Sequence, residues 1–156
     1  MNMNRRFIST ASDVFVSCLI ILWIYTGLNK AIDFENMKLQ LGRSPFISSY
    51  ATIIAYTLPI AELITALLLV IRKTRLIGLY LSLFLMTSFT EYVYFMLKYS
   101  YDLPCSCGGV LEKLSWEDHL IFNFIFTVIC LAAIIIDNYL PKTLVQRISS
   151  KRPGMY

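Results

Sequence analysis

Four long apolar stretches constrain the fold of this chain more than any other feature of its sequence. A helix needs about 20 residues to cross a hydrocarbon core of about 30 Å, and each stretch reaches that length. The stretches lack the alternation that membrane strands require, and backbone amides in lipid must be satisfied within one segment. The sequence therefore predicts an all-α, polytopic membrane protein, one four-helix bundle and one domain over residues 1–156, with spans near 12–31, 48–71, 76–98 and 116–136.

The composition agrees with a lipid-facing surface. Hydrophobic residues make up 57% of the chain and charged residues only 15%, whereas soluble domains carry about a quarter charged residues. The net charge of +4 comes from basic residues that flank the apolar stretches, so we expect the lipid bilayer as a partner and no nucleic acid. The stretch from Val14 to Leu28 is long for a signal peptide and no Ala-x-Ala site follows it, which favours a retained first helix.

The distribution of the fourteen Lys and Arg residues predicts the orientation. Nine fall on one side of the membrane: Arg5, Arg6, Arg72, Lys73, Arg75, Lys142, Arg147, Lys151 and Arg152. The other five are Lys30, Lys38, Arg43, Lys98 and Lys113. The positive-inside rule then places both termini, and a basic tail over 137–156, in the cytoplasm of a protein of the inner (cytoplasmic) membrane. The connections that follow the first and third spans face the periplasm or exterior, where a disulfide can persist.

A dithiol motif, Pro104-Cys105-Ser106-Cys107-Gly108-Gly109, occupies the second of these outer connections. Two cysteines so close together can approach the Cα separation of about 4.4–6.8 Å that a disulfide accepts, in a small and readily reduced ring. The motif therefore predicts a redox-active pair. Two alternatives remain open: a static bridge, and a metal pair with His119 as third ligand, which is one ligand short of a usual zinc set. We therefore predict no metal at this site.

Polar side chains inside the spans gather at the same outer level. Glu91 lies seven residues before Lys98, about 10 Å below the outer surface. Trp116, His119 and Asn123 share one helix face by their spacing. We predict catalytic roles for Cys105, Cys107, His119 and Glu91, and quinone binding by Asn29, Lys30, Trp116 and Asn123. A carboxylate, an imidazole and an amide beside a dithiol can bind a quinone carbonyl and move its protons, although such groups can also merely join helices.

Several other features are left with two interpretations. Glu62 lies near the middle of the second span, where it must be neutral, paired or in a watery cavity, and the sequence does not name its partner. Cys18 and Cys130 either pass electrons across the bilayer or serve as small core residues. The segment 33–45 is either a short interfacial helix over the cysteine motif or a plain connector.

Several segments of the chain resemble the MauE and DoxX-like membrane proteins. They are Tyr25-Thr26-Gly27-Leu28-Asn29-Lys30, Ser44-Pro45-Phe46, Glu62, Phe89-Thr90-Glu91-Tyr92, the cysteine motif, Leu114-Ser115-Trp116, His119 and Asn123. The resemblance covers about residues 12–136. It implies a four-helix bundle loosely like vitamin K epoxide reductase, with Cys105 and Cys107 acting in disulfide formation beside an extracytoplasmic thioredoxin-like protein. The connection 33–47 lacks the second cysteine pair that relays electrons in vitamin K epoxide reductases. A partner protein would therefore have to supply any such electron relay.

These observations predict a component of a membrane thiol–disulfide oxidoreductase. Its Cys105–Cys107 pair would exchange electrons, in either direction, between a thioredoxin-like partner or disulfide-containing client and a membrane quinone. The interpretation requires Glu91 and His119 to point into the bundle. The alternatives are a non-enzymatic membrane subunit or assembly factor with a structural cysteine loop, and a metal-handling protein.

Overall fold

The structure, a computed structural model, describes residues 3–44, 46–99 and 115–150. It consists of α1 (Met3–Ile32), α2 (Phe34–Arg43), the short 3-10 helix η1 (Ser48–Tyr50), α3 (Ala51–Val70), α4 (Arg75–Tyr99) and α5 (Trp116–Ser150). Within these ranges there is no strand, and the predicted all-α class is confirmed.

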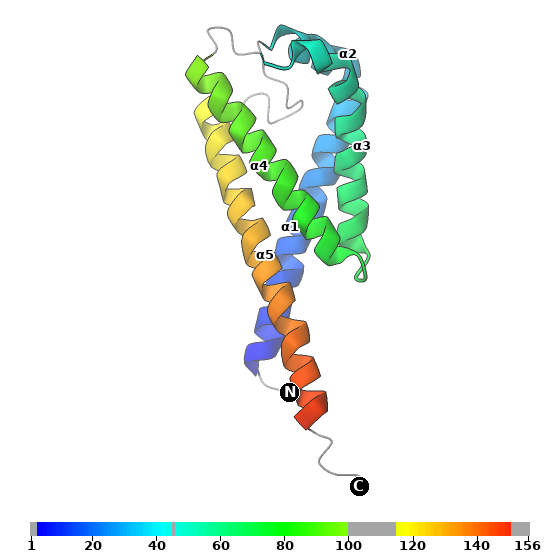
Figure 1. Cartoon of the computed structure of the whole chain (residues 1–156), viewed down its shortest axis with the longest axis vertical. Coiled ribbons are helices and arrows are strands. Elements are labelled where there is room, and N and C mark those ends of the chain that lie inside the picture. Colours follow the sequence, from blue (N-terminus) through cyan, green and yellow to red (C-terminus); the bar gives the residue numbers. More distant parts are fainter. Residues whose placement is uncertain (1–2, 45, 100–114, 151–156) are drawn as a thin grey trace.

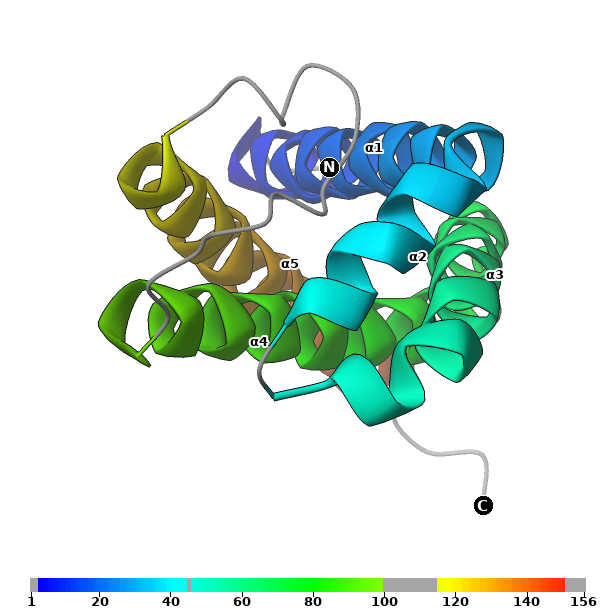
Figure 2. The same ribbon diagram turned by 90° about the horizontal axis from the view of Figure 1, so that it is seen from above.

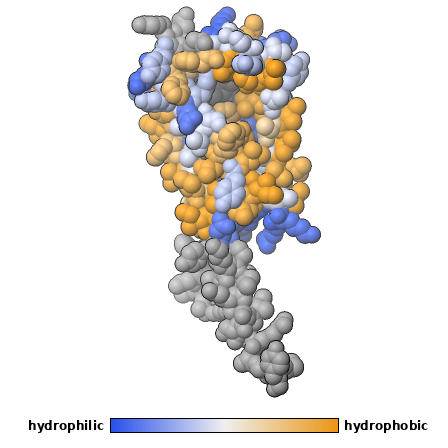
Figure 3. Space-filling view, viewed as in Figure 1, coloured by the Kyte–Doolittle hydropathy of each residue, from blue (hydrophilic) through white to orange (hydrophobic). Residues whose placement is uncertain are grey.

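Four helices are long and apolar enough to cross a membrane, as predicted. Their spanning segments are Thr10–Ile32, Ser48–Val70, Arg75–Tyr99 and Glu117–Asn138, each within two residues of the predicted boundaries. Figure 3 shows the corresponding broad belt of hydrophobic residues between hydrophilic ends. The last helix continues beyond its span to Ser150.

The four spanning helices form a ring in the order α1, α3, α4 and α5, each in contact with the next (Figure 1). The start of α1 and the end of α5 lie at one end of the bundle, and α2 lies at the opposite end. Seen from above, α2 crosses the opening between the spanning helices (Figure 2). Both ends of the connection between α4 and α5, Tyr99 and Ser115, are at the α2 end.

A core of buried apolar side chains joins the four spanning helices. Trp23 and Leu19 on α1 are fully buried, and the Trp23 indole donates a hydrogen bond to the Ser82 hydroxyl on α4. Cys130 is also fully buried in this core, whereas Cys18 is exposed on the outer surface of α1. A side chain at Gly78 would meet the Leu69 backbone nitrogen at 2.9 Å, so glycine permits the close approach of α4 to α3.

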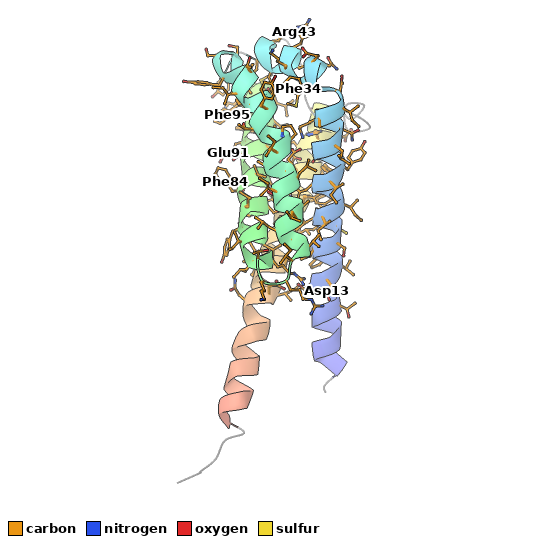
Figure 4. The ribbon with its side chains drawn as sticks, turned by 90° about the vertical axis from the view of Figure 1, so that its right-hand side faces the viewer. Asp13, Phe34, Arg43, Phe84, Glu91 and Phe95 are labelled. Atoms are coloured by element: carbon orange, nitrogen blue, oxygen red, sulfur yellow. The ribbon has the colours of Figure 1, made fainter. Side chains whose placement is uncertain are left out.

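An ionic cluster joins three helices at the end of the bundle opposite α2. Arg75 at the start of α4 donates to Asp13 on α1 at 2.8 Å and to the Ser12 hydroxyl at 2.9 Å. Its guanidinium lies 3.2 Å from Asp137 on α5, and Ser12 donates to the same carboxylate. Figure 4 labels Asp13 at this level. Arg75 is only 12% exposed, so the cluster fixes the lower ends of α1, α4 and α5 to one another.

The segment after α1 is a helix packed onto the bundle, not a plain connector. Met37 and Leu41 are buried beneath α2, and the Phe34 ring lies 4.6 Å from that of Tyr56 on α3. Just after the helix, the Ser44 hydroxyl contacts the sulfur of Met96 on α4 at 3.7 Å. These contacts hold α2 across the end of the bundle, above its upper half.

Candidate functional site

A cavity of about 260 Å³ lies in the upper half of the bundle, under α2. Most of its wall is apolar, and all four spanning helices and α2 contribute to it. The residues that line it are Leu22, Trp23, Thr26, Lys30, Met37, Leu41, Ile47, Ile54, Leu58, Glu62, Met86, Ser88, Phe89, Tyr92, Val93, His119, Phe122 and Asn123. An apolar cavity with a few convergent polar groups is the usual form of a small-molecule site.

A buried ion pair provides the charged part of this cavity. Lys30 Nζ donates to Glu62 Oε1 at 2.6 Å, and the two side chains are 6% and 0% exposed. Helical side chains lean toward the N-terminus of their helix. Because α1 rises toward α2 and α3 descends from it, Lys30 leans down and Glu62 leans up, which brings the charges together. The Lys30 ammonium also lies 5.4 Å from the centre of the Phe89 ring, a cation–π distance.

The ion pair depends on a close approach of α1 to α3. Gly27 lies one turn before Lys30, and a side chain there would meet Leu63 Cγ at 3.0 Å and Glu62 Cβ at 3.4 Å. The glycine in the segment Tyr25–Lys30 therefore has a structural reason, since it allows the two charged residues to reach each other.

Further polar atoms face the cavity without a full set of partners. Glu62 Oε2 is buried and has no hydrogen-bond donor at bonding distance among the described residues. The Thr26 side chain lies beside this carboxylate. Asn123 on α5 is 4% exposed, and its Nδ2 donates to none of the described residues. His119, one turn earlier, is 5% exposed and lines the same cavity. A buried acceptor and a buried donor in one cavity are suited to a ligand that carries both functions.

The structure brings Lys30, His119 and Asn123 together as the sequence predicted, but not Glu91 or Asn29. Glu91 is exposed on the outer face of α4 and lines a different groove, so the prediction that it points into the bundle is wrong. Asn29 is half-buried and does not line the cavity. Both errors have one cause: position along a helix gives a residue's depth in the membrane but not the direction of its side chain.

Other predicted site residues lie outside the described part of the chain. Cys105 and Cys107 belong to the connection 100–114, and only its flanking residues, at the α2 end, can be placed. Trp116 is the first residue of α5, and its side chain is not described. Among the described residues no three His, Cys, Asp or Glu side chains form a metal-binding group, and the metal alternative with both cysteines stays a prediction.

Sequence reasoning missed three residues of the site, namely Glu62, Phe89 and Tyr92. Glu62 itself was a signal, because a carboxylate inside a span must be neutral, paired or in water, but its position near the middle of its span does not point to Lys30, which lies near the outer end of the first span. Phe89 and Tyr92 are spaced i, i+3 on the inner face of α4, and both line the cavity.

The four apolar helices define this chain as a multi-pass membrane protein, with an apolar cavity beneath α2 in its bundle. A family profile described as "Methylamine utilisation protein MauE" matches residues 8–136, most of the chain, and the chain therefore belongs to the MauE family. No curated protein and no solved structure matches it significantly.

Proposed function

We propose that this protein is the membrane component of a thiol–disulfide exchange system, with Cys105 and Cys107 as the exchanging pair and a quinone as the partner in the cavity. Because Glu91 faces outward, the proposal gives it no role in the cavity and assigns the buried carboxylate to Glu62 instead. The observation that carries the proposal is the buried Lys30–Glu62 pair with Asn123 in an apolar cavity at the α2 end. Family membership supports a membrane role that accompanies methylamine utilisation. In this proposal the cysteine connection faces the periplasm or exterior.

The cavity residues fit a quinone head group. A volume of about 260 Å³ is near the lower end for ligand pockets, which suits a single ring rather than a large ligand. When bound, a quinone would supply an acceptor for two electrons and two protons. Asn123 Nδ2 would donate to a ring carbonyl, and Glu62 Oε2 would accept from a ring hydroxyl in the reduced state. Lys30 keeps the Glu62 carboxylate in place, and the apolar walls exclude water from it.

The exchange needs a dithiol partner as electron donor and a quinone as electron acceptor, with the Cys105–Cys107 pair between them. The thiolate of a reduced thioredoxin-like partner or client attacks one sulfur of the Cys105–Cys107 disulfide, and its second thiolate resolves the mixed disulfide. The partner leaves oxidised, and Cys105 and Cys107 hold the two electrons as thiols. A bound quinone would accept the two electrons and two protons that are released when the disulfide re-forms. His119 and Glu62, both facing the cavity, are the groups placed to move the protons.

Thiol trapping tests the proposal directly. The purified protein, reduced with dithiothreitol and then freed of it, is mixed with a short-chain ubiquinone, and mass spectrometry follows alkylation of the peptide that holds both cysteines. We expect the pair to become oxidised on quinone addition. The matched control Cys18→Ser, an exposed residue in the lower half of α1, should behave like the wild type.

Two results would reject this function. A pair that stays oxidised in dithiothreitol is a structural clip, as expected for a non-enzymatic subunit or assembly factor. If the pair can be reduced but quinone does not reoxidise it, the cysteines do not exchange electrons with a quinone in the cavity. A Cys107→Ser variant should also fail to oxidise a reduced dithiol partner, because it cannot form the Cys105–Cys107 disulfide that the partner's thiolate attacks.

A further inference from the structure

A second site lies on the outer surface of the bundle, between the upper parts of α4 and α5. It is a shallow groove lined by Thr90, Glu91, Tyr94, Leu120, Ile121 and Phe124. Three of these residues form exposed apolar rims: Tyr94, Ile121 and Phe124 are 48%, 58% and 63% exposed. Figure 4 shows Glu91 between Phe84 and Phe95 along one edge of the bundle, on the side away from α1.

Glu91 is a carboxylate at hydrocarbon depth. It lies eight residues before the end of α4 at Tyr99, which is about 12 Å along the helix. Because α4 rises toward α2, the side chain leans toward the middle of the membrane rather than toward the outer surface. A short acidic side chain in this direction cannot reach water, and an ionisable group left in lipid is costly and marks a functional contact.

The described part of the chain offers Glu91 no partner of its own. No hydrogen bond or ion pair joins it to any described residue. The neighbouring Thr90 hydroxyl donates to the Met86 carbonyl. Lys98, two turns above, lies over the rings of Tyr94 and Tyr99 at 5.8 and 5.4 Å from their centres. The carboxylate is thus available to a group from outside the bundle.

Charge decides which occupant fits the groove. A second copy of this chain with the same orientation, paired through the same face, would bring Glu91 against Glu91 at equal depth, and like charges repel. A basic side chain instead forms a charge-assisted hydrogen bond with the carboxylate, and the bare apolar rims receive the rest of a helix. We propose that this groove docks a transmembrane helix of a partner protein that presents a Lys or Arg side chain at the depth of Glu91.

The test uses the full-length protein in phosphatidylcholine vesicles with synthetic membrane-spanning peptides. One peptide is a 23-residue Leu-Ala helix with a single Lys about 12 Å from its outer end, and the matched peptide carries Leu there. Energy transfer between labelled protein and labelled peptide measures association. We expect the Lys peptide to associate about tenfold more tightly than the Leu peptide, as one interhelical polar contact allows.

Three variants distinguish the groove from general attraction. Glu91→Gln should remove most of the preference for the Lys peptide, and Glu91→Lys should reverse it in favour of a peptide with Glu at the same position. Glu117→Gln, which removes an exposed carboxylate from the first turn of α5, should leave the preference unchanged. Equal association of both peptides with the wild type, or a preference that survives Glu91→Gln, would overturn the proposal. Self-association that replaces peptide binding would overturn it in favour of a second copy.

Discussion

Replacing Lys30 by Met should destabilise the bundle strongly, because it leaves the Glu62 carboxylate buried without its ion-pair partner. Two unit charges about 4 Å apart attract by about 4 kcal/mol at an effective dielectric constant of about 20. Removing one partner of a buried pair typically costs about 3–5 kcal/mol, since the other charge stays desolvated. With the pair 6% and 0% exposed, we expect a loss of about 4 kcal/mol in the free energy of unfolding.

The double variant Lys30→Met/Glu62→Leu separates pairing from packing. With both charges gone, no desolvated charge remains, and stability should return to within about 1–2 kcal/mol of the wild type. The assay is unfolding in mixed micelles with increasing dodecyl sulfate, followed by the fluorescence of the tryptophans, of which Trp23 is fully buried in the core. If the double variant loses as much stability as the sum of the two single variants, the residues are not coupled and the described pair does not exist in the membrane.

The remaining predictions concern single positions. Asn123→Leu removes a buried donor that has no partner among the described residues, so unfolding free energy should stay within about 1 kcal/mol of the wild type or rise, while quinone affinity measured by titration falls about tenfold. Gly78→Ala should lower the free energy of unfolding by about 1–3 kcal/mol in the same assay, because the new Cβ would lie 2.9 Å from the Leu69 backbone nitrogen. Gly42→Ala, with open space around the new Cβ, should raise it by about 0.5–1 kcal/mol. Arg75→Met should cost about 1–2 kcal/mol, because the two carboxylates that it releases on α1 and α5 are partly exposed to water. Replacing the exposed Arg72 by Gln should change stability by less than about 0.5 kcal/mol, and equal effects of the two substitutions would refute the ionic cluster.

The helices could be predicted from the sequence because a lipid environment permits few backbone conformations. A backbone in hydrocarbon must satisfy its own hydrogen bonds, so an apolar run of sufficient length has one stable form, and its charged ends fix the boundaries. The short helix α2 was one of two alternatives. It forms because Met37 and Leu41, spaced i, i+4, find apolar neighbours on α3.

The composition of the site could not be read in the same way. In a water-soluble helix, the apolar face shows which side is buried, but a membrane helix is apolar on both sides. On α4, Phe89 and Glu91 are two residues apart, so a rotation of about 200° around the helix axis places them on nearly opposite faces. The neighbouring residues do not indicate which of the two faces inward. Contacts with α1 and α5 decide this, and they turn Phe89 toward Lys30 and leave Glu91 outside.

The two proposals assign the membrane carboxylates Glu62 and Glu91 to separate functions, which can fail independently. Glu62 is buried, is paired with Lys30 and lines the same cavity as the buried Asn123 amide, so its removal should affect quinone reaction and stability but not the docking of a helix on the outer surface. Glu91 is outside the cavity and unpaired within the described residues, so its removal should affect helix docking but leave quinone reoxidation of the cysteines unchanged. A variant of Glu91 that blocked quinone reaction in the purified protein would mean that the cavity extends to the outer face of α4, and both assignments would have to be revised.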